Sequence, residues 1–145
     1  MKVLIIEDNK LKAENIKKCV LQHFEGASIE VATAYSTGVR KAYVGNYDFI
    51  IIDNSLPYYN DHLNDIRPDM AALILENLED EIDGKCIICS AYERGEKEDY
   101  FSRLVEGYGI CIGYVRYDPC EDDWKNQTIR LIKEREWIKK QKNNK

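Results

Sequence analysis

The sequence predicts a single α/β domain in which helices cover both faces of a parallel sheet. Short apolar runs alternate with amphipathic helical patterns along the whole chain, and the links between them are short. The length of 145 residues suits one domain with a substantial core. Hydrophobic residues make up 44% of the chain and charged residues 32%, a balance typical of a folded globular protein and not of a disordered one.

Five apolar runs are the predicted strands. The first of them is short and continuous and is followed by acids and Asn9, which indicates a strand that is buried on both faces. The predicted strands cover residues 3–6, 29–32, 47–52, 86–89 and 110–115.

Amphipathic segments follow each of these strands and are the predicted helices. They cover residues 11–24, a segment from about Ser36 to Gly45, and residues 70–78, 96–106 and 121 to about 141. Ser36 and Asp69 are the predicted N-caps of the second and third helices. Residues 58–68 form a polar loop that is longer than an ordinary strand-to-helix link, and loops of that length are typically functional or mobile.

Charge and the distribution of apolar residues indicate which partners and which compartment to expect. The net charge of −5 argues against a nucleic-acid-binding surface, and the basic residues near the end of the chain are typical of a solvated helix end. No stretch of about 18 apolar residues could span a membrane. The first residues lack the apolar core of a signal peptide, so we expect a cytoplasmic protein without nucleic-acid or membrane partners.

Five cysteines are expected to stay reduced in that compartment. Cys86 and Cys89 have the spacing of a metal or redox pair. Residues three apart on a strand point to opposite faces of the sheet, so these two thiols cannot share a metal or form a disulfide. The sequence therefore predicts buried packing for both.

Acidic side chains follow the first and third predicted strands. In an open parallel sheet, ligands bind outside the carboxyl ends of the strands. The first strand ends in Glu7 and Asp8, and the third ends in Asp53. If these strands are neighbours, the three carboxylates repel one another, and Mg²⁺ would remove the conflict because it prefers hard oxygen ligands. The backbone carbonyl of Ser55 could complete the ligands that the protein supplies.

Asp53 is the candidate nucleophile because it ends the most hydrophobic strand, and an aspartate beside such an ion can attack phosphorus to form an acyl phosphate. Ser90 ends the fourth strand, and Tyr114 lies on the fifth. The alternative is that these acids merely mark the points where buried strands turn into solvent. Because the acids end two of the strands and a hydroxyl ends a third, a functional site is favoured over this alternative.

The sequence resembles the receiver domain of two-component response regulators, the CheY-like family, along essentially its whole length. The resemblance is carried by LIIEDN, YDFIIIDNSLP, CIICSA and GYVRYDP, each at a predicted strand end. It implies a flavodoxin-like, three-layer α/β/α sandwich of (βα)5 topology with a parallel five-stranded sheet of order 2-1-3-4-5. It also implies one receiver (response regulatory) domain over residues 1–142, with residues 143–145 as a tail.

The resemblance also implies a role for each candidate residue. Asp53 would be the phosphoacceptor, and Ser90 would bond a phosphoryl oxygen while Tyr114 changes rotamer with it. Mg²⁺ would be held by the side chains of Glu7, Asp8 and Asp53 and the backbone carbonyl of Ser55.

Two features depart from the receiver pattern. The lysine that normally lies directly before the proline after the fifth strand, and neutralises the phosphoryl charge, is absent from residues 115–119, a stretch that has one extra residue. Arg116 is a possible replacement, although guanidinium and ammonium groups are not interchangeable at a tight site. The second departure is the inserted loop Tyr58–Pro68, which we expect to overhang the pocket, with His62 as a solvent-exposed residue and not a ligand.

Three functions remain open at this stage. The leading one is a stand-alone receiver, not an enzyme, that takes a phosphoryl group from a histidine kinase or phosphotransfer protein. It would signal by binding an unidentified downstream protein or by forming a homodimer through the face of strands four and five. The alternative is a pseudo-receiver that binds proteins without phosphorylation. A Mg²⁺-dependent phosphatase or nucleotide-binding enzyme is disfavoured because no glycine-rich loop follows the first strand.

Overall fold

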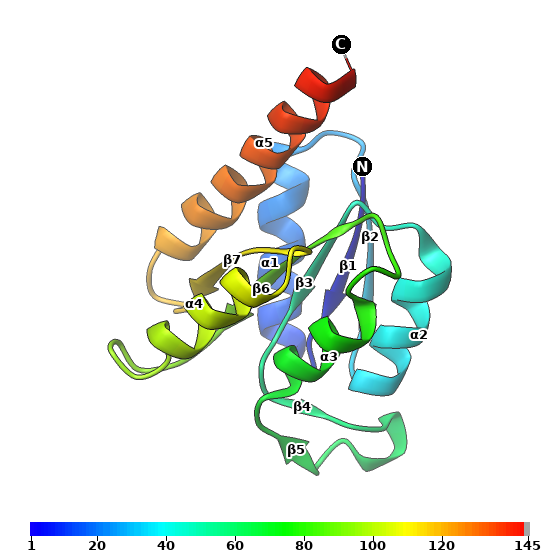
Figure 1. Ribbon diagram of the computed structural model, residues 1–145. Helices are drawn as coiled ribbons and strands as arrows, with labels where there is room; N and C mark the ends of the chain where they lie inside the picture. The colour runs from blue at the N-terminus through cyan, green and yellow to red at the C-terminus, as the bar shows by residue number, and fades with distance from the viewer. Residues whose placement is uncertain (144–145) are drawn as a thin grey trace.

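The computed structural model describes residues 1–143 as a three-layer α/β/α sandwich (Figure 1). The middle layer is a parallel five-stranded sheet of order β2-β1-β3-β6-β7. Its strands are β1 (Lys2–Ile6), β2 (Ser28–Ala32), β3 (Phe49–Ile52), β6 (Lys85–Ser90) and β7 (Cys111–Arg116). Counted along the chain, these five strands have the order 2-1-3-4-5, which confirms the predicted topology and makes β1 and β3 neighbours.

Helices cover both faces of the sheet. One face carries α1 (Lys10–His23) and α5 (Asp123–Asn143). The other face carries α2 (Tyr35–Gly45), α3 (Met70–Leu78) and α4 (Glu98–Gly107). The observed ends of these helices and of the five strands lie within two residues of the predicted ones.

The sheet separates two apolar cores because successive residues of a strand point to opposite faces. On β1, Val3 and Ile5 pack with α1 and α5, whereas Leu4 and Ile6 pack with the helices of the other face. The same alternation on β6 places Cys86 in one core and Cys89 in the other, which confirms that these two thiols point apart.

Helix α2 begins earlier than predicted. Its first residue is Tyr35, and the N-cap position is Ala34, whose side chain offers no oxygen to cap the helix. Ser36 therefore lies inside the helix, and the prediction that it caps α2 is wrong. Its backbone N–H instead donates to the carbonyl oxygen of Tyr58 at 3.0 Å, a contact that reaches into the inserted loop.

The predicted cap of α3 is also wrong. Asp69 precedes the helix, but its backbone is left-handed with φ of 60°, and its side chain makes no capping bond. Asn54 takes this role from the end of β3. Its carbonyl oxygen accepts from Met70 N at 2.9 Å, and its Oδ1 accepts from Ala71 N at 3.4 Å. The residue after Asp53 therefore anchors the start of α3.

The inserted segment has regular structure that the sequence analysis missed. It contains the short 3-10 turn η1 (Asn60–His62) and β5 (Ile66–Arg67), and β5 pairs antiparallel with β4 (Leu56–Pro57), which directly precedes the segment. Thr37 Oγ1 donates to Asn60 Oδ1 at 2.7 Å and ties the insertion to the start of α2. Figure 1 shows the hairpin at the edge of the molecule where the parallel strands end.

The last helix reaches further than predicted. Helix α5 ends at Asn143, so the first residue of the predicted tail is helical, and residues 144 and 145 lie outside the described part of the chain. Among residues 1–143, no helix has the length and apolar character needed to cross a membrane.

Candidate functional site

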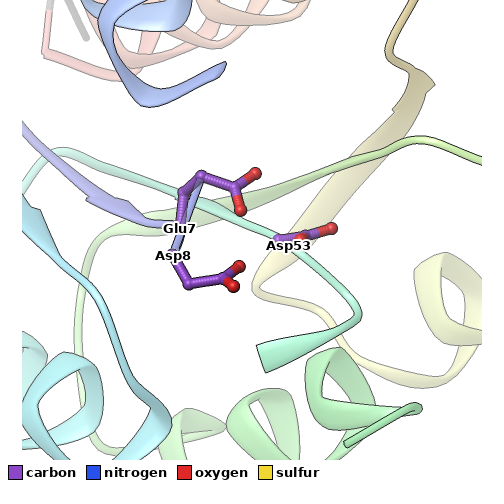
Figure 2. A group of neighbouring side chains, drawn as sticks. All are labelled: Glu7, Asp8 and Asp53. Carbon is purple, nitrogen blue, oxygen red and sulfur yellow. The ribbon is translucent and has the colours of Figure 1, made fainter. Parts of the chain in front are cut away.

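Three carboxylates meet at the carboxyl edge of the sheet. Parallel pairing aligns Ile6 of β1 with Ile52 of β3, so the residues that follow the two strands lie side by side. Glu7, Asp8 and Asp53 each contribute an oxygen, and these oxygens lie within 4.8 Å of one another. Figure 2 shows the Glu7 and Asp8 carboxylates directed from the end of β1 toward the side on which Asp53 lies. The predicted meeting of the three acids is confirmed.

Two of the three acids are buried. Glu7 is 2% exposed and Asp53 is 9% exposed, whereas Asp8 is half-buried. Burial raises the pKa of Glu7 to about 8, and the charge of Asp53 adds to this effect while that of Lys12 opposes it. Desolvation of Glu7 thus outweighs the nearby Lys12 charge, and a further cation at the cluster would favour the ionised form of this carboxyl group.

Lys12 is the residue of the site that the sequence analysis missed. Its Nζ lies 2.6 Å from Glu7 Oε1 and 3.2 Å from Asp53 Oδ1, and it donates to the carbonyl oxygen of Cys89 at 2.7 Å. The contact with Glu7 Oε1 is an ion pair outside hydrogen-bond geometry. Burial alone would lower the pKa of Lys12, but the nearby negative charges, first that of Asp53, outweigh burial and raise it. The ammonium is therefore charged.

The first turn of α1 carries Lys12 to the cluster. Asn9 caps this helix by accepting from Lys12 N with its Oδ1 at 3.0 Å, which orients the turn directly after the acid pair. A lysine in the first turn opposes the helix dipole, and no acidic residue shares that turn. No signal in the sequence singles out Lys12, because Lys10 has the same charge in the same turn and is exposed.

Arg116 is paired away from the three acids. Its Nη2 lies 3.3 Å from Glu121 Oε2 and 3.7 Å from Asp118 Oδ2, and its Nη1 donates to the carbonyl oxygen of Tyr92 at 3.4 Å. The cation that lies beside Asp53 in the structure is Lys12 and not Arg116, and the role of Arg116 as a replacement for the missing lysine stays a prediction. The physical reason for this placement is that Arg116 has its own acidic partners in the loop that follows β7.

Comparison by sequence gives one partial relative. No protein-family model matches the chain. The uncharacterized protein y4jR of Sinorhizobium fredii (strain NBRC 101917 / NGR234) is 37% identical over 60 residues. That match covers 41% of this chain and 40% of y4jR, so it spans less than half of the relative's length.

Solved structures match nearly the whole chain. The signal receiver domain of a putative LuxO repressor from Vibrio parahaemolyticus has a TM-score of 0.70 at 18% identity, over 96% of this chain and 94% of that one. A CheY-like receiver domain protein from Methanospirillum hungatei has a TM-score of 0.66 at 17% identity, over 99% and 98%. The response regulator TrrA from Thermotoga maritima, solved in complex with Mg²⁺-BeF, has a TM-score of 0.65 at 21% identity, over 90% and 97%.

The chain has the receiver-domain fold. In this receiver fold, the acidic cluster lies at the carboxyl edge of the sheet, on the ends of its two central neighbours β1 and β3. Ser55 is exposed and follows Asp53 by two positions, and the use of its backbone carbonyl as a metal ligand stays a prediction. His62 is exposed and lies 3.3 Å from Asp61 within the inserted hairpin, as expected for a loop residue.

The two remaining candidate residues, Ser90 and Tyr114, lie on the neighbouring strands β6 and β7. Ser90 is buried at the end of β6, where the sheet register aligns it with Arg116 of β7. Tyr114 is half-buried on β7, with its hydroxyl 3.3 Å from Ser102 Oγ of α4 and its ring 5.7 Å from that of Phe101. The side chain of Tyr114 therefore bridges the edge of the sheet and α4, the elements whose shared surface a rotation of this ring would alter.

Proposed function

We propose that the chain is a phosphoprotein of a two-component system, in which Asp53 takes a phosphoryl group from a histidine kinase or a phosphotransfer protein. The observation that carries this proposal is the meeting of Glu7, Asp8 and Asp53 within 4.8 Å at the carboxyl edge of the sheet. The receiver fold supports it, and TrrA, a protein of the same fold, is described as a complex with Mg²⁺-BeF. In this proposal the chain transmits a signal and is not an enzyme that turns over free substrates.

The donor set of the cluster fits Mg²⁺. Three carboxylates against one Lys12 ammonium leave two negative charges when all three acids are ionised, which is the charge that a divalent cation balances. Carboxylate and carbonyl oxygens are the ligands Mg²⁺ prefers, and Glu7, Asp8, Asp53 and the Ser55 carbonyl would hold it. When bound, Mg²⁺ supplies positive charge that stabilises the oxygens of a transferring phosphoryl group.

Asp53 is placed to act as the nucleophile. Lys12 Nζ and the backbone N–H of Asn54 both contact Asp53 Oδ1, at 3.2 and 2.8 Å. We assign the attack to Oδ2 for this reason. The bond from Oδ2 to phosphorus forms as the bond from phosphorus to the imidazole nitrogen of the donor histidine breaks, and that nitrogen keeps the electron pair.

The phosphoryl group on Asp53 would be read out through Ser90 and Tyr114. Its oxygens attract the Ser90 hydroxyl at the end of β6, and Tyr114 then turns away from Ser102 into the space that Ser90 leaves. This movement changes the surface formed by α4 and β7, which pack against each other. A downstream protein, or a second copy of the chain, would bind that altered surface.

One observation favours the alternative, a module that binds proteins without phosphorylation. The Lys12 ammonium already contacts both buried acids, so it could serve as a permanent cation in the place where a receiver needs an exchangeable one. The two proposals differ in whether Asp53 reacts.

Incubation with Mg²⁺ and phosphoramidate, followed by mass spectrometry of the intact protein, tests the reaction. We expect a mass increase of one phosphoryl group on the wild type and none on Asp53→Asn. Asp61→Asn is the matched control, because Asp61 is an exposed acid of the inserted hairpin, and it should react like the wild type. A wild type that stays unmodified and binds no beryllium fluoride would favour the phosphorylation-independent module, and turnover of free nucleotide would favour an enzyme.

A further inference from the structure

The burial of Lys12 needs an explanation. This residue is 6% exposed, although lysine is almost never buried unless its charge is paired. A methionine or leucine on this face of α1 would fill the same space between the helix and the sheet without the cost of desolvating an ammonium group. The retained charge therefore points to a task for the ammonium at the acids it touches.

The position of Nζ relates that task to Asp53. It lies 3.2 Å from Asp53 Oδ1, so a phosphoryl group attached to this carboxylate would bring its own oxygens within contact distance of the ammonium. Phosphorylation would replace the single negative charge of the carboxylate by about two. An ammonium already desolvated and held by the Cys89 carbonyl needs no reorganisation to meet that charge.

Tyr117 lies directly beneath Lys12. Its backbone N–H donates to the carbonyl oxygen of Ser90 at 2.9 Å, which fixes the end of β7 beside the end of β6. Its ring centre lies 5.3 Å from Lys12 Nζ, and its hydroxyl accepts from Asn15 Nδ2 of α1 at 2.9 Å. The side chains of positions 117 and 12 thus approach each other next to the site.

We infer that Lys12 stabilises the phosphoryl group on Asp53 from α1, and that Tyr117 occupies the place after β7 from which a lysine would otherwise do so. This inference rests on the proposed phosphorylation of Asp53. It assigns Lys12 a direct contact with the phosphoryl oxygens and Tyr117 the role of positioning Lys12. Arg116 is a poorer candidate for this role because its guanidinium is paired with Glu121 and Asp118.

The first test compares two substitutions. Lys12→Met keeps the length and the apolar packing of the side chain and removes its charge, whereas Arg116→Met removes a cation that does not touch the cluster. We expect Lys12→Met to lower the rate of phosphorylation by phosphoramidate, and the affinity for beryllium fluoride in Mg²⁺, by about 100-fold. Arg116→Met should show no comparable loss.

A second test measures Mg²⁺ binding in the absence of a phosphodonor. It distinguishes a direct contact of Lys12 with the phosphoryl group from a structural role of Lys12. Removal of a positive charge beside the acids should leave the Mg²⁺ affinity of Lys12→Met equal to or higher than that of the wild type. If the affinities for Mg²⁺ and beryllium fluoride fall together, Lys12 acts by shaping the site, and the inference is wrong. Lys12→Gln, with a neutral polar end group one bond shorter than lysine, provides a second variant if Lys12→Met does not fold.

A relocation experiment makes the test sharper. The double variant Lys12→Met/Tyr117→Lys returns an ammonium to the site from the end of β7, and we expect it to recover most of the lost rate. An equal loss in the single and double variants, both folded by circular dichroism, would overturn the inference. If the wild type and Lys12→Met accept a phosphoryl group at the same rate, this inference alone is overturned. If the wild type never reacts, the proposed function is overturned as well.

Discussion

The ring of Tyr117 packs against the indole of Trp124, with the two ring centres 4.9 Å apart and the planes inclined by 53°. The same tyrosine ring lies 5.3 Å from Lys12 Nζ, so a short chain of contacts connects the acidic cluster to a tryptophan that is 2% exposed. A cation that binds at the cluster changes the charge around Lys12 and thereby the surroundings of this buried indole. We therefore expect Trp124 to report occupancy of the site.

We expect Mg²⁺ to change the fluorescence of Trp124 in a saturable titration. Trp137, the other tryptophan, is 63% exposed near the end of α5, so Trp137→Phe should keep the signal and remove background. Asp8→Asn should move the transition to higher Mg²⁺ concentration because it removes a charged oxygen donor. Persistence of the full signal in Trp124→Phe would show that the change arises elsewhere.

The raised pKa of Glu7 predicts that the stability of the metal-free protein depends on pH. Burial raises its pKa from 4.5 to about 8 in the folded state. Between these values the folded chain holds a proton that the unfolded chain has released, so the contribution of Glu7 to stability is complete below pH 4.5 and is lost as the pH rises through 8. Thermal unfolding of the wild type against Glu7→Gln, which does not titrate, measures this difference.

The raised pKa of Glu7 also predicts that Mg²⁺ binding releases a proton. The metal needs ionised Glu7, so Mg²⁺ affinity should increase as the pH approaches 8, by at most about tenfold per pH unit. Isothermal titration calorimetry in two buffers with different ionisation enthalpies counts the released protons. Glu7→Gln should release none from this position, and a pH-independent affinity of the wild type would contradict the prediction.

Gly84 is a packing constraint at the start of β6. A Cβ at this position would collide with the backbone carbonyl oxygen of Tyr47, which cannot move aside as a flexible side chain can. We expect Gly84→Ala to lower the free energy of unfolding by about 1–3 kcal/mol. Gly107→Ala, at the end of α4, is the control because a Cβ there meets nothing within 4 Å; it should be neutral or stabilising by up to about 1 kcal/mol in urea unfolding.

The sequence was sufficient for the order of strands and helices, and the structure shows why. Strand β3 is entirely apolar and β1 is apolar after Lys2 because helices cover both faces of the sheet, so their pattern differs clearly from that of the amphipathic helices. Glu7, Asp8 and Asp53 could be grouped without coordinates because parallel neighbours bring their carboxyl ends to one edge. The cap of α3 could not be predicted because it depends on local geometry. Asp69 has a suitable side chain but a left-handed backbone, and Asn54 caps the helix from the end of β3.

Lys12 was missed for a different reason. A lysine in a helix is normally solvated, and nothing in its local pattern distinguishes it from Lys10, which is exposed in the same turn. Its burial follows from long-range packing, because Asp53 and the Cys89 carbonyl come from strands far along the chain. The receiver pattern favours a replacement cation at the end of β7, where Arg116 lies, and a cation supplied by another element can be identified only from the tertiary contacts.

Asn9 gives the last prediction, because it couples the stability of α1 to the site. Its Oδ1 accepts from the backbone N–H of Lys12 at 3.0 Å, and its own N–H donates to Glu7 Oε2 at 3.3 Å. Asn9→Ala should lower the free energy of unfolding by about 1 kcal/mol, as expected for the loss of an N-cap. Because the same turn carries Lys12, this variant should also bind beryllium fluoride more weakly than the wild type. Asn9→Ser restores a capping oxygen and should recover both properties, and an Asn9→Ala protein of unchanged stability and affinity would contradict the coupling.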